Sequence, residues 1–167
     1  VVGYHGEQLR EYVDSLGIRT PILYVSNDIY YRTNNIYSLY LARHHLQEED
    51  TLLLESDLIF EDSALECLVK DPYPTLALVA KYESWMDGTV LKIDGDGGIQ
   101  GFFDKDHFQF SEIPQYYKTV NIYKFSREFS QNRYVPFLEA YSRALGDNEY
   151  YEQVLKVISL LDRPEIR

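Results

Sequence analysis

The fold of this chain follows from one segment, TLLLESDLIFED, at residues 51–62. Thr51 to Leu54 form a short apolar run between two segments of helical spacing, which is typical of a buried parallel strand. The chain turns acidic directly after this run, and Asp57 is among the acidic residues. Because α/β sheets carry ligand-binding groups at the carboxyl ends of their strands, the pattern places Asp57 at such an edge. A carboxylate there suits Mg²⁺ beside phosphate oxygens, although a solvated acidic loop explains the same residues.

Helix and strand patterns alternate on both sides of this segment. We predict the other elements, in chain order, as the end of a strand at Val1–Val2, a helix over 5–16, a strand at 22–25, a helix over 35–46, a helix over 63–70, a strand over 75–81, a hairpin over 89–103, a strand over 118–125, a helical stretch over 126–145 interrupted by Pro136, and a helix capped by Asp147. Such alternation predicts an α/β fold with a mixed, mainly parallel sheet flanked by helices, Rossmann-like in its order.

Composition narrows the classes of function. The 167 residues suffice for a single domain with a real core. The net charge of -11 argues against non-specific binding to nucleic acid or to anionic membranes, so an anionic substrate needs a local cation. A single cysteine cannot form an internal disulfide, and no segment has the length and apolarity of a membrane span. We therefore expect a cytoplasmic protein.

Several segments together resemble a known family. They are VVGYHGEQL (1–9), SNDIYYRTNNIYSLYLA (26–42), LLLESDLIFED (52–62) and YYEQVL (150–155). This order is similar to that of the nucleotidyltransferases of the CTP:phosphocholine and 2-aminoethylphosphonate cytidylyltransferase type. NNIYSL and the strand that leads to Asp57 are the most specific pieces, and the resemblance extends from Val1 to about Leu161.

The resemblance also bears on the two ends of the chain. Family members begin with a strand and a glycine-rich loop that wraps the nucleotide triphosphate, and they end with a strand that carries an acidic motif. The sequence contains neither feature; it begins VVGYHG and ends LLDRPEIR. We therefore expect an internal segment of such a domain, incomplete at both ends: either a truncated product or a part of a longer bifunctional polypeptide. By itself the chain should show little nucleotidyl transfer, and its exposed sheet edges should favour a homodimer.

The reaction that the resemblance implies is Mg²⁺-dependent transfer of CMP from CTP to a small phosphorylated or phosphonylated amino-alcohol, with release of pyrophosphate. Asp57 matches the metal-binding Asp of the family, and Glu152 falls where relatives place a second acidic ligand. Lys81 ends a predicted strand and could pair with a phosphate in the same crevice. The resemblance thus implies Asp57 as a catalytic residue, and Asp57 and Glu152 as metal ligands. The place of Lys81 at a strand end adds it as a second catalytic candidate. A surface lysine at a strand end and a solvent-facing helix residue are the alternatives for Lys81 and Glu152.

Further residues are expected to bind substrate. Asn34, Asn35 and Ser38 lie at a helix start, where they either cap the helix or line the cleft. Lys118 and Asn121 belong to the strand predicted over 118–125. An ammonium head group requires aromatic faces and a carboxylate, and the candidates are Trp85, Tyr150 and Tyr151, with Glu83 or Asp87.

Two alternatives stay open. Glu55-Ser56-Asp57 loosely imitates the acidic motif of metal-dependent glycosyltransferases of related fold (GT-A-like), and sugar-1-phosphate nucleotidyltransferases are relatives of the family named above. The chain could also be an inert fragment, or an interaction module that keeps the fold. Neither the nucleotide nor the acceptor is determined by the sequence.

Overall fold

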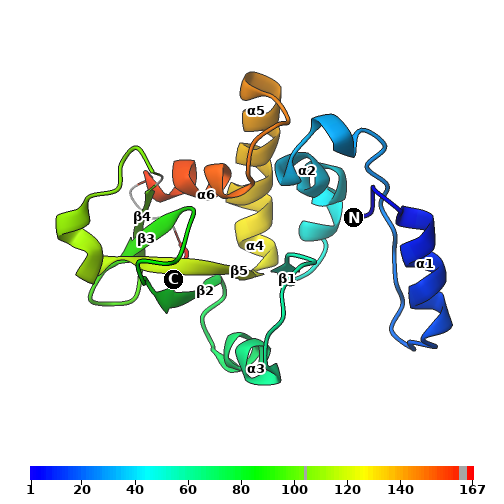
Figure 1. The fold of residues 1–167 in the computed structure, drawn as a ribbon, viewed down its shortest axis with the longest axis horizontal. Helices are drawn as coiled ribbons and strands as arrows, with labels where there is room; N and C mark the ends of the chain where they lie inside the picture. Colours follow the sequence, from blue (N-terminus) through cyan, green and yellow to red (C-terminus); the bar gives the residue numbers. More distant parts are fainter. Residues whose placement is uncertain (104, 162–164) are drawn as a thin grey trace.

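The computed structural model describes residues 1–103, 105–161 and 165–167 (Figure 1). The described elements follow the chain as α1 (Gly6–Ser15), η1 (Tyr30–Arg32), α2 (Asn35–Leu46), β1 (Thr51–Leu54), α3 (Asp62–Lys70), β2 (Leu76–Lys81), β3 (Val90–Ile93), β4 (Ile99–Phe103), η2 (Phe110–Gln115), β5 (Tyr117–Phe125), α4 (Arg127–Phe129), η3 (Ser130–Tyr134), α5 (Val135–Leu145) and α6 (Glu152–Ser159). The predicted α/β class is confirmed, and the strands and helices expected over 35–46, 51–54, 75–81, 89–103 and 118–125 are present.

The sheet is antiparallel, and the prediction of a mainly parallel sheet was wrong. β5 lies between β1 and β2 and runs antiparallel to both, so these two strands share a direction without being neighbours. β3 also pairs antiparallel with β5, and β4 with β3. A short buried apolar strand has the same sequence pattern in a parallel and in an antiparallel sheet. The position of β5 between β1 and β2 makes this sheet antiparallel.

One edge of β5 is divided between two partners. Leu54 of β1 pairs with Ile122, and Val90 of β3 pairs with Lys118, both on the edge opposite β2. On the β2 side, Ala77 and Val79 pair with Tyr123 and Thr119, so β5 places residues 120–122 opposite one residue of β2. This bulge holds Asn121 at a φ of 58°, a left-handed conformation that asparagine tolerates. The carboxyl end of β1 therefore meets the start of β3 beside the bulge.

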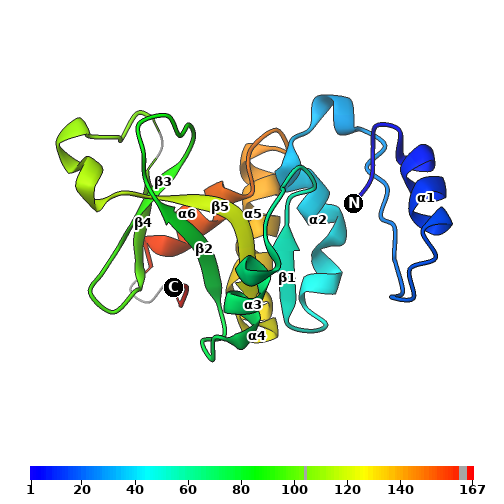
Figure 2. The same cartoon turned by 60° about the horizontal axis from the view of Figure 1, so that its bottom comes forward.

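Helices α2, α5 and α6 cover the sheet (Figure 2). Ile36, Leu39 and Leu46 point from α2 into a core shared with Leu138 of α5 and Leu155 of α6. Residues 127–145 form one continuous helical stretch, because a π-helical turn at Ser130–Tyr134 lies directly before the proline. The expected interruption at Pro136 takes the form of this π-helical turn, because a proline inside a helical stretch lacks the N–H that the regular hydrogen-bond ladder requires.

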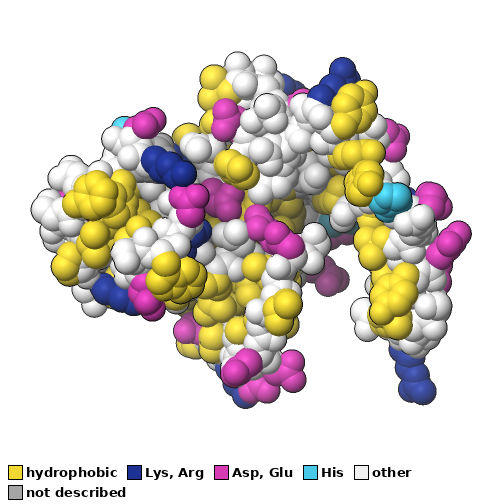
Figure 3. Space-filling view, in the orientation of Figure 1, with side chains coloured by type: hydrophobic (Ala, Val, Ile, Leu, Met, Phe, Trp, Pro, Cys, Tyr) yellow, Lys and Arg dark blue, Asp and Glu magenta, His cyan; other side chains and the backbone are white. Residues whose placement is uncertain are grey.

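The N-terminal segment stands apart from this core. α1 forms where its spacing predicts a helix, but its apolar residues are exposed, including Tyr12 at 63% (Figure 3). The expected strand at 22–25 is not formed. The neighbouring Ser26 forms an isolated parallel bridge with Val2, whose N–H donates to the Val25 carbonyl at 2.8 Å. Among the described residues, no helix combines the length and apolarity needed to cross a bilayer.

Candidate active site

A carboxylate held by two asparagines lies where β1 ends. Glu55 accepts a hydrogen bond on Oε1 from Asn35 Nδ2 (3.2 Å) and on Oε2 from Asn121 Nδ2 (2.8 Å). The first donor comes from the start of α2 and the second from the bulge of β5. Thr119 Oγ1 donates to Asn121 Oδ1 at 3.0 Å, which fixes the orientation of that amide. The carboxylate of Glu55 is thus held in one orientation by two elements that are far apart in sequence.

The start of α6 is tied to the start of α2. Asn35 Oδ1 accepts from the backbone N–H of Tyr151 at 2.9 Å. The loop before α6 also binds the α2 backbone, because Asn34 N donates to the Asp147 carbonyl and Ile36 N to the Glu149 carbonyl. These contacts bring Glu152, the first residue of α6, close to the end of β1.

Opposite charges gather between these elements. Burial lowers the pKa of Lys118, against the opposing effect of the negative charges of Glu152, Glu55 and Asp87. Burial raises the pKa of Glu152, and the negative charge of Glu55 adds to this, while Lys118 opposes it. Figure 3 shows acidic side chains near the middle of this face, beside β5 and α6. One half-buried cation therefore faces two carboxylates, an arrangement that can hold phosphate groups together with a metal ion.

Buried tyrosines form the floor of the site. The rings of Tyr123 and Tyr151 meet edge to face at 5.9 Å, and the hydroxyl of Tyr134 donates to the Tyr151 carbonyl at 3.2 Å. Burial raises the pKa of both Tyr123 and Tyr151, so their hydroxyls stay neutral near physiological pH. This rigid aromatic layer supports the start of α6 from below.

The two residues expected to be catalytic lie apart from the centre of this group. Asp57 is exposed in the turn that follows Glu55. Lys81 is exposed at the end of β2, where its Nζ donates to the Pro114 carbonyl at 2.5 Å and lies 4.2 Å from the centre of the Tyr117 ring. The recorded contacts do not bring Lys81 to Glu55 or Glu152. Lys118 contacts the carbonyl oxygen of Thr119 at 3.3 Å, and burial lowers its pKa while the charges of Glu152 and Glu55 raise it.

The residues expected to bind substrate do not form one group either. Asn34 accepts from the backbone N–H of Asn35, and Ser38 accepts from Asn27 Nδ2 at 3.3 Å. Trp85 is 75% exposed and donates from its indole to Glu83, while Tyr150 is 57% exposed. Tyr151 is buried at 3% exposure, so the three expected aromatic residues do not form one surface for a ligand.

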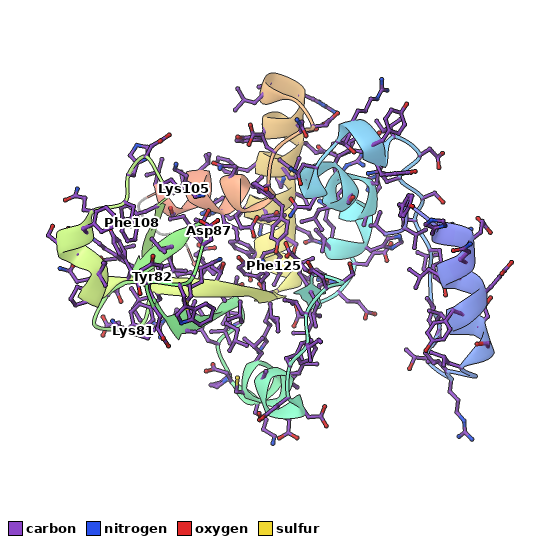
Figure 4. All side chains as sticks on the ribbon, viewed as in Figure 1. Lys81, Tyr82, Asp87, Lys105, Phe108 and Phe125 are labelled. Atoms are coloured by element: carbon purple, nitrogen blue, oxygen red, sulfur yellow. The ribbon has the colours of Figure 1, made fainter. Side chains whose placement is uncertain are left out.

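A different aromatic cavity lies beside Lys118. It measures about 250 Å³ and is lined by Tyr82, Met86, Asp87, Gly88, Lys105, Phe108 and Phe110. Figure 4 shows Tyr82, Asp87, Lys105 and Phe108 in this part of the molecule, on the loops that follow β2 and β4. Asp87 pairs with Lys105 at 3.0 Å, and a Cβ at Gly88 would lie 3.6 Å from Lys118 Nζ. The cavity therefore borders the charged site across the backbone of Gly88.

Comparison with known proteins shows what the chain as a whole is similar to. The chain is 34% identical over 154 residues to the CMP-5'-(3-aminopropyl)phosphonate synthase of Streptomyces rubellomurinus, a match that covers 91% of this chain. Its fold matches that of a CTP:phosphocholine cytidylyltransferase from Streptococcus pneumoniae with a TM-score of 0.60 and 17% identity, over 96% of this chain. The chain is cytidylyltransferase-like. The resemblance inferred from its sequence is thereby confirmed.

The matches leave much of each relative uncovered. This cytidylyltransferase-like chain spans 24% of the length of the phosphonate synthase and 64% of the solved cytidylyltransferase chain. A scan against models of protein families finds no match.

The donor atoms of the site fit Mg²⁺ only if the substrate contributes. Across residues 1–103, 105–161 and 165–167, no group of three or more His, Cys, Asp or Glu side chains could hold a metal ion. Mg²⁺ requires fewer, because it keeps waters and binds one or two carboxylates together with substrate phosphates. Glu152 Oε2 is buried and has no hydrogen-bond partner among the described residues, which leaves it available. Glu152, with Asp57 on the neighbouring turn, would supply the protein oxygens.

Sequence reasoning gave too little weight to Glu55. It directly follows the apolar run and precedes Asp57 by two residues, so it appeared only as part of a loose acidic motif. No local signal distinguishes the two acids. Their difference arises from Asn35 and Asn121, which reach Glu55 from 20 and 66 residues away in sequence.

Proposed function

We propose that this chain is the nucleotidyl-transfer region of an enzyme that transfers CMP from CTP to a small phosphonate or phosphate that carries an amine, with Mg²⁺ as cofactor and pyrophosphate as the leaving group. The observation that carries the proposal is the 34% identity to a relative named as a CMP-5'-(3-aminopropyl)phosphonate synthase. The electrostatic coupling of Lys118 to Glu55 and Glu152 supports it, because it combines a cation with carboxylates near the end of β1.

The reaction requires the protein to align the reactants and to neutralise charge. An acceptor oxygen attacks the α-phosphorus of CTP, a new P–O bond forms, and the bond to the β-phosphate oxygen breaks. The attacking oxygen is already anionic, so no general base is needed, and rate acceleration comes from alignment and charge neutralisation. Lys118 binds and orients phosphate or phosphonate oxygens as a point charge. Bound Mg²⁺ supplies further neutralisation of phosphate charge.

The acceptor amine has a matching environment in the cavity beside Lys118. Tyr82 and Phe108 offer aromatic faces, with ring centres 5.4 Å apart. Asp87 offers a carboxylate, and the ammonium group would displace the exposed Lys105 that pairs with it at 3.0 Å. A zwitterionic aminoalkylphosphonate would place its ammonium group against these residues and its phosphonate toward Lys118. The cavity thus replaces Trp85, Tyr150 and Tyr151 as the proposed ammonium site.

Calorimetric titration with CTP and Mg²⁺ tests the metal and nucleotide parts of the proposal. We expect CTP to bind wild-type protein only when Mg²⁺ is present, and more weakly to Asp57→Ala and Lys118→Ala. The exposed acid Asp14 provides a matched control, because Asp14→Ala removes the same charge on α1, which stands apart from the site. Absence of CTP binding with Mg²⁺ would refute the nucleotide assignment for this chain.

Acceptor specificity can be tested by ³¹P NMR at high protein concentration, which detects slow transfer. We expect 3-aminopropylphosphonate to react in preference to propylphosphonate, which lacks the amine. Asp87→Asn should reduce this preference and leave the rate with propylphosphonate unchanged. Equal rates for the two acceptors in wild-type protein would contradict the ammonium site, while consumption of a nucleotide sugar would favour the glycosyltransferase alternative.

A further inference from the structure

The side chain of Asn35 connects the two segments that carry the proposed metal ligands. Its Nδ2 donates to Glu55 Oε1 at 3.2 Å, and its Oδ1 accepts from Tyr151 N at 2.9 Å. Glu55 leads into the turn that carries Asp57, and Tyr151 directly precedes Glu152. One amide group therefore spans the gap between the end of β1 and the first turn of α6.

We propose that Asn35 is a positioning residue, which fixes the separation between the Asp57 turn and Glu152 and so sets the affinity of the site for a divalent cation. The inference rests on the proposed function. Asparagine suits this position because a primary amide offers a donor and an acceptor on one short, planar group. Both of these groups are used within the protein, so the role differs from the substrate contact expected from sequence.

The surroundings of Asn35 make it a rigid connection. Asn34 Oδ1 accepts from the backbone N–H of Asn35 at 2.8 Å, and the adjacent Ile36 is fully buried. Asn121 holds the second oxygen of Glu55 at 2.8 Å, so the carboxylate cannot turn away from the first asparagine. Outer partners of this kind typically change metal affinity by about 10- to 100-fold when they are mutated.

The decisive variant is Asn35→Asp. It preserves the shape of the side chain and can still accept from Tyr151 N, but it places a carboxylate against Glu55 in place of a donor. The measurement is Mn²⁺ binding in the presence of CTP, followed by electron paramagnetic resonance. We expect Asn35→Asp to weaken Mn²⁺ binding by about 10-fold or more. Affinity within about 3-fold of wild type would overturn the inference.

A second substitution tests whether the effect passes through Glu55. In the double variant N35D/E55Q the donor and the acceptor exchange places, because the glutamine amide introduced at position 55 can donate from Nε2 to the new carboxylate while its Oε1 still accepts from Asn121. The net charge of the pair is also restored. We expect the double variant to recover most of the Mn²⁺ affinity that N35D loses. A double variant no better than N35D would show that Asn35 acts by another route and would overturn the inference.

Two controls separate positioning from general damage. Arg43→Gln lies on the same helix but contacts Glu139 and Tyr40, so its Mn²⁺ affinity should equal that of wild type. Amide exchange at Tyr151, measured without metal, should accelerate in Asn35→Ala and stay slow in Asn35→Asp, which retains the acceptor. Slow exchange in Asn35→Ala would contradict the contact.

The failure of this inference can be told from that of the proposed function. Wild-type protein that binds no Mn²⁺ would refute the proposed metal requirement, whereas binding unaffected by N35D would refute this inference alone.

Discussion

Glu152→Gln should stabilise the metal-free protein at neutral and alkaline pH. Burial is the main cause that raises the pKa of Glu152, and the charge of Glu55 adds to it, with Lys118 as a partial counterweight. Its Oε2 is also buried without a hydrogen-bond partner among the described residues. The charged form of this carboxylate therefore lowers the free energy of unfolding. The proposed role of Glu152 as a metal ligand gives a reason for keeping a group that weakens the fold.

The sign of the pH dependence follows from linkage. Because the pKa of Glu152 is higher in the folded than in the unfolded chain, the folded state binds more protons between the two values. The wild-type free energy of unfolding therefore falls as the pH rises from the unfolded value of 4.5 through the folded value, and stays low above it. Glutamine is neutral throughout, so the variant lacks this loss. Its advantage should be small at pH 4.5 and grow toward pH 8, by about 1.4 kcal/mol for each pH unit that separates the folded from the unfolded pKa.

Urea denaturation followed by circular dichroism, with a chelator present, measures this difference at both pH values. Glu149→Gln is the matched control: it makes the same chemical change at an exposed position and should alter stability by less than about 0.5 kcal/mol. Added Mg²⁺ and CTP should stabilise the wild type more than Glu152→Gln, which reverses the order. A variant less stable than wild type at pH 8 without metal, or a difference independent of pH, would refute the reasoning.

Other predictions concern packing, backbone and charge. Phe125 is fully buried, with its ring centre 4.9 Å from that of Tyr134 (Figure 4), so Phe125→Ala should lower the free energy of unfolding by about 3 to 5 kcal/mol in urea titration. Gly88 has a φ of 92°, and Gly88→Ala should lower the melting temperature in calorimetry because alanine disfavours that conformation. Arg43 pairs with Glu139 at 2.7 Å near the surface, so Arg43→Met should cost about 1 kcal/mol or less, and less still in high salt. An unchanged stability of Phe125→Ala would contradict the packing described for the core.

Part of the site was accessible from sequence alone. The resemblance indicated Asn35, in NNIYSL, and Glu152, in YYEQVL, and the strand predicted over 118–125 indicated Lys118 and Asn121. The structure gathers these four around the end of β1. The sequence did not reveal that both asparagine amides bind Glu55. That arrangement depends on the bulge in β5 and the left-handed Asn121, features for which the local sequence gives no signal.

The aromatic residues show the limit of residue type as a guide. Trp85 and Tyr151 looked equally suited to a ligand, yet Trp85 is 75% exposed and Tyr151 only 3%. The cavity instead involves Tyr82 and Phe108, which belong to loops after different strands. Whether an aromatic side chain meets a ligand depends on which loops meet in space, and these loops are brought together by the pairing of β3 with β4 and β5.

The sequence by itself determined the local elements, because helical and strand periodicity is a property of neighbouring residues. It placed α2 at residues 35–46, β1 at 51–54 and the hairpin of β3 and β4. Only the tertiary structure decided the direction of the sheet, since β5 is recruited between β1 and β2 by pairing with residues some seventy positions earlier, such as Leu54 with Ile122. That same long-range pairing positions Asn121 against Glu55. The position of β5 between β1 and β2 therefore sets both the direction of the sheet and the geometry of the candidate site.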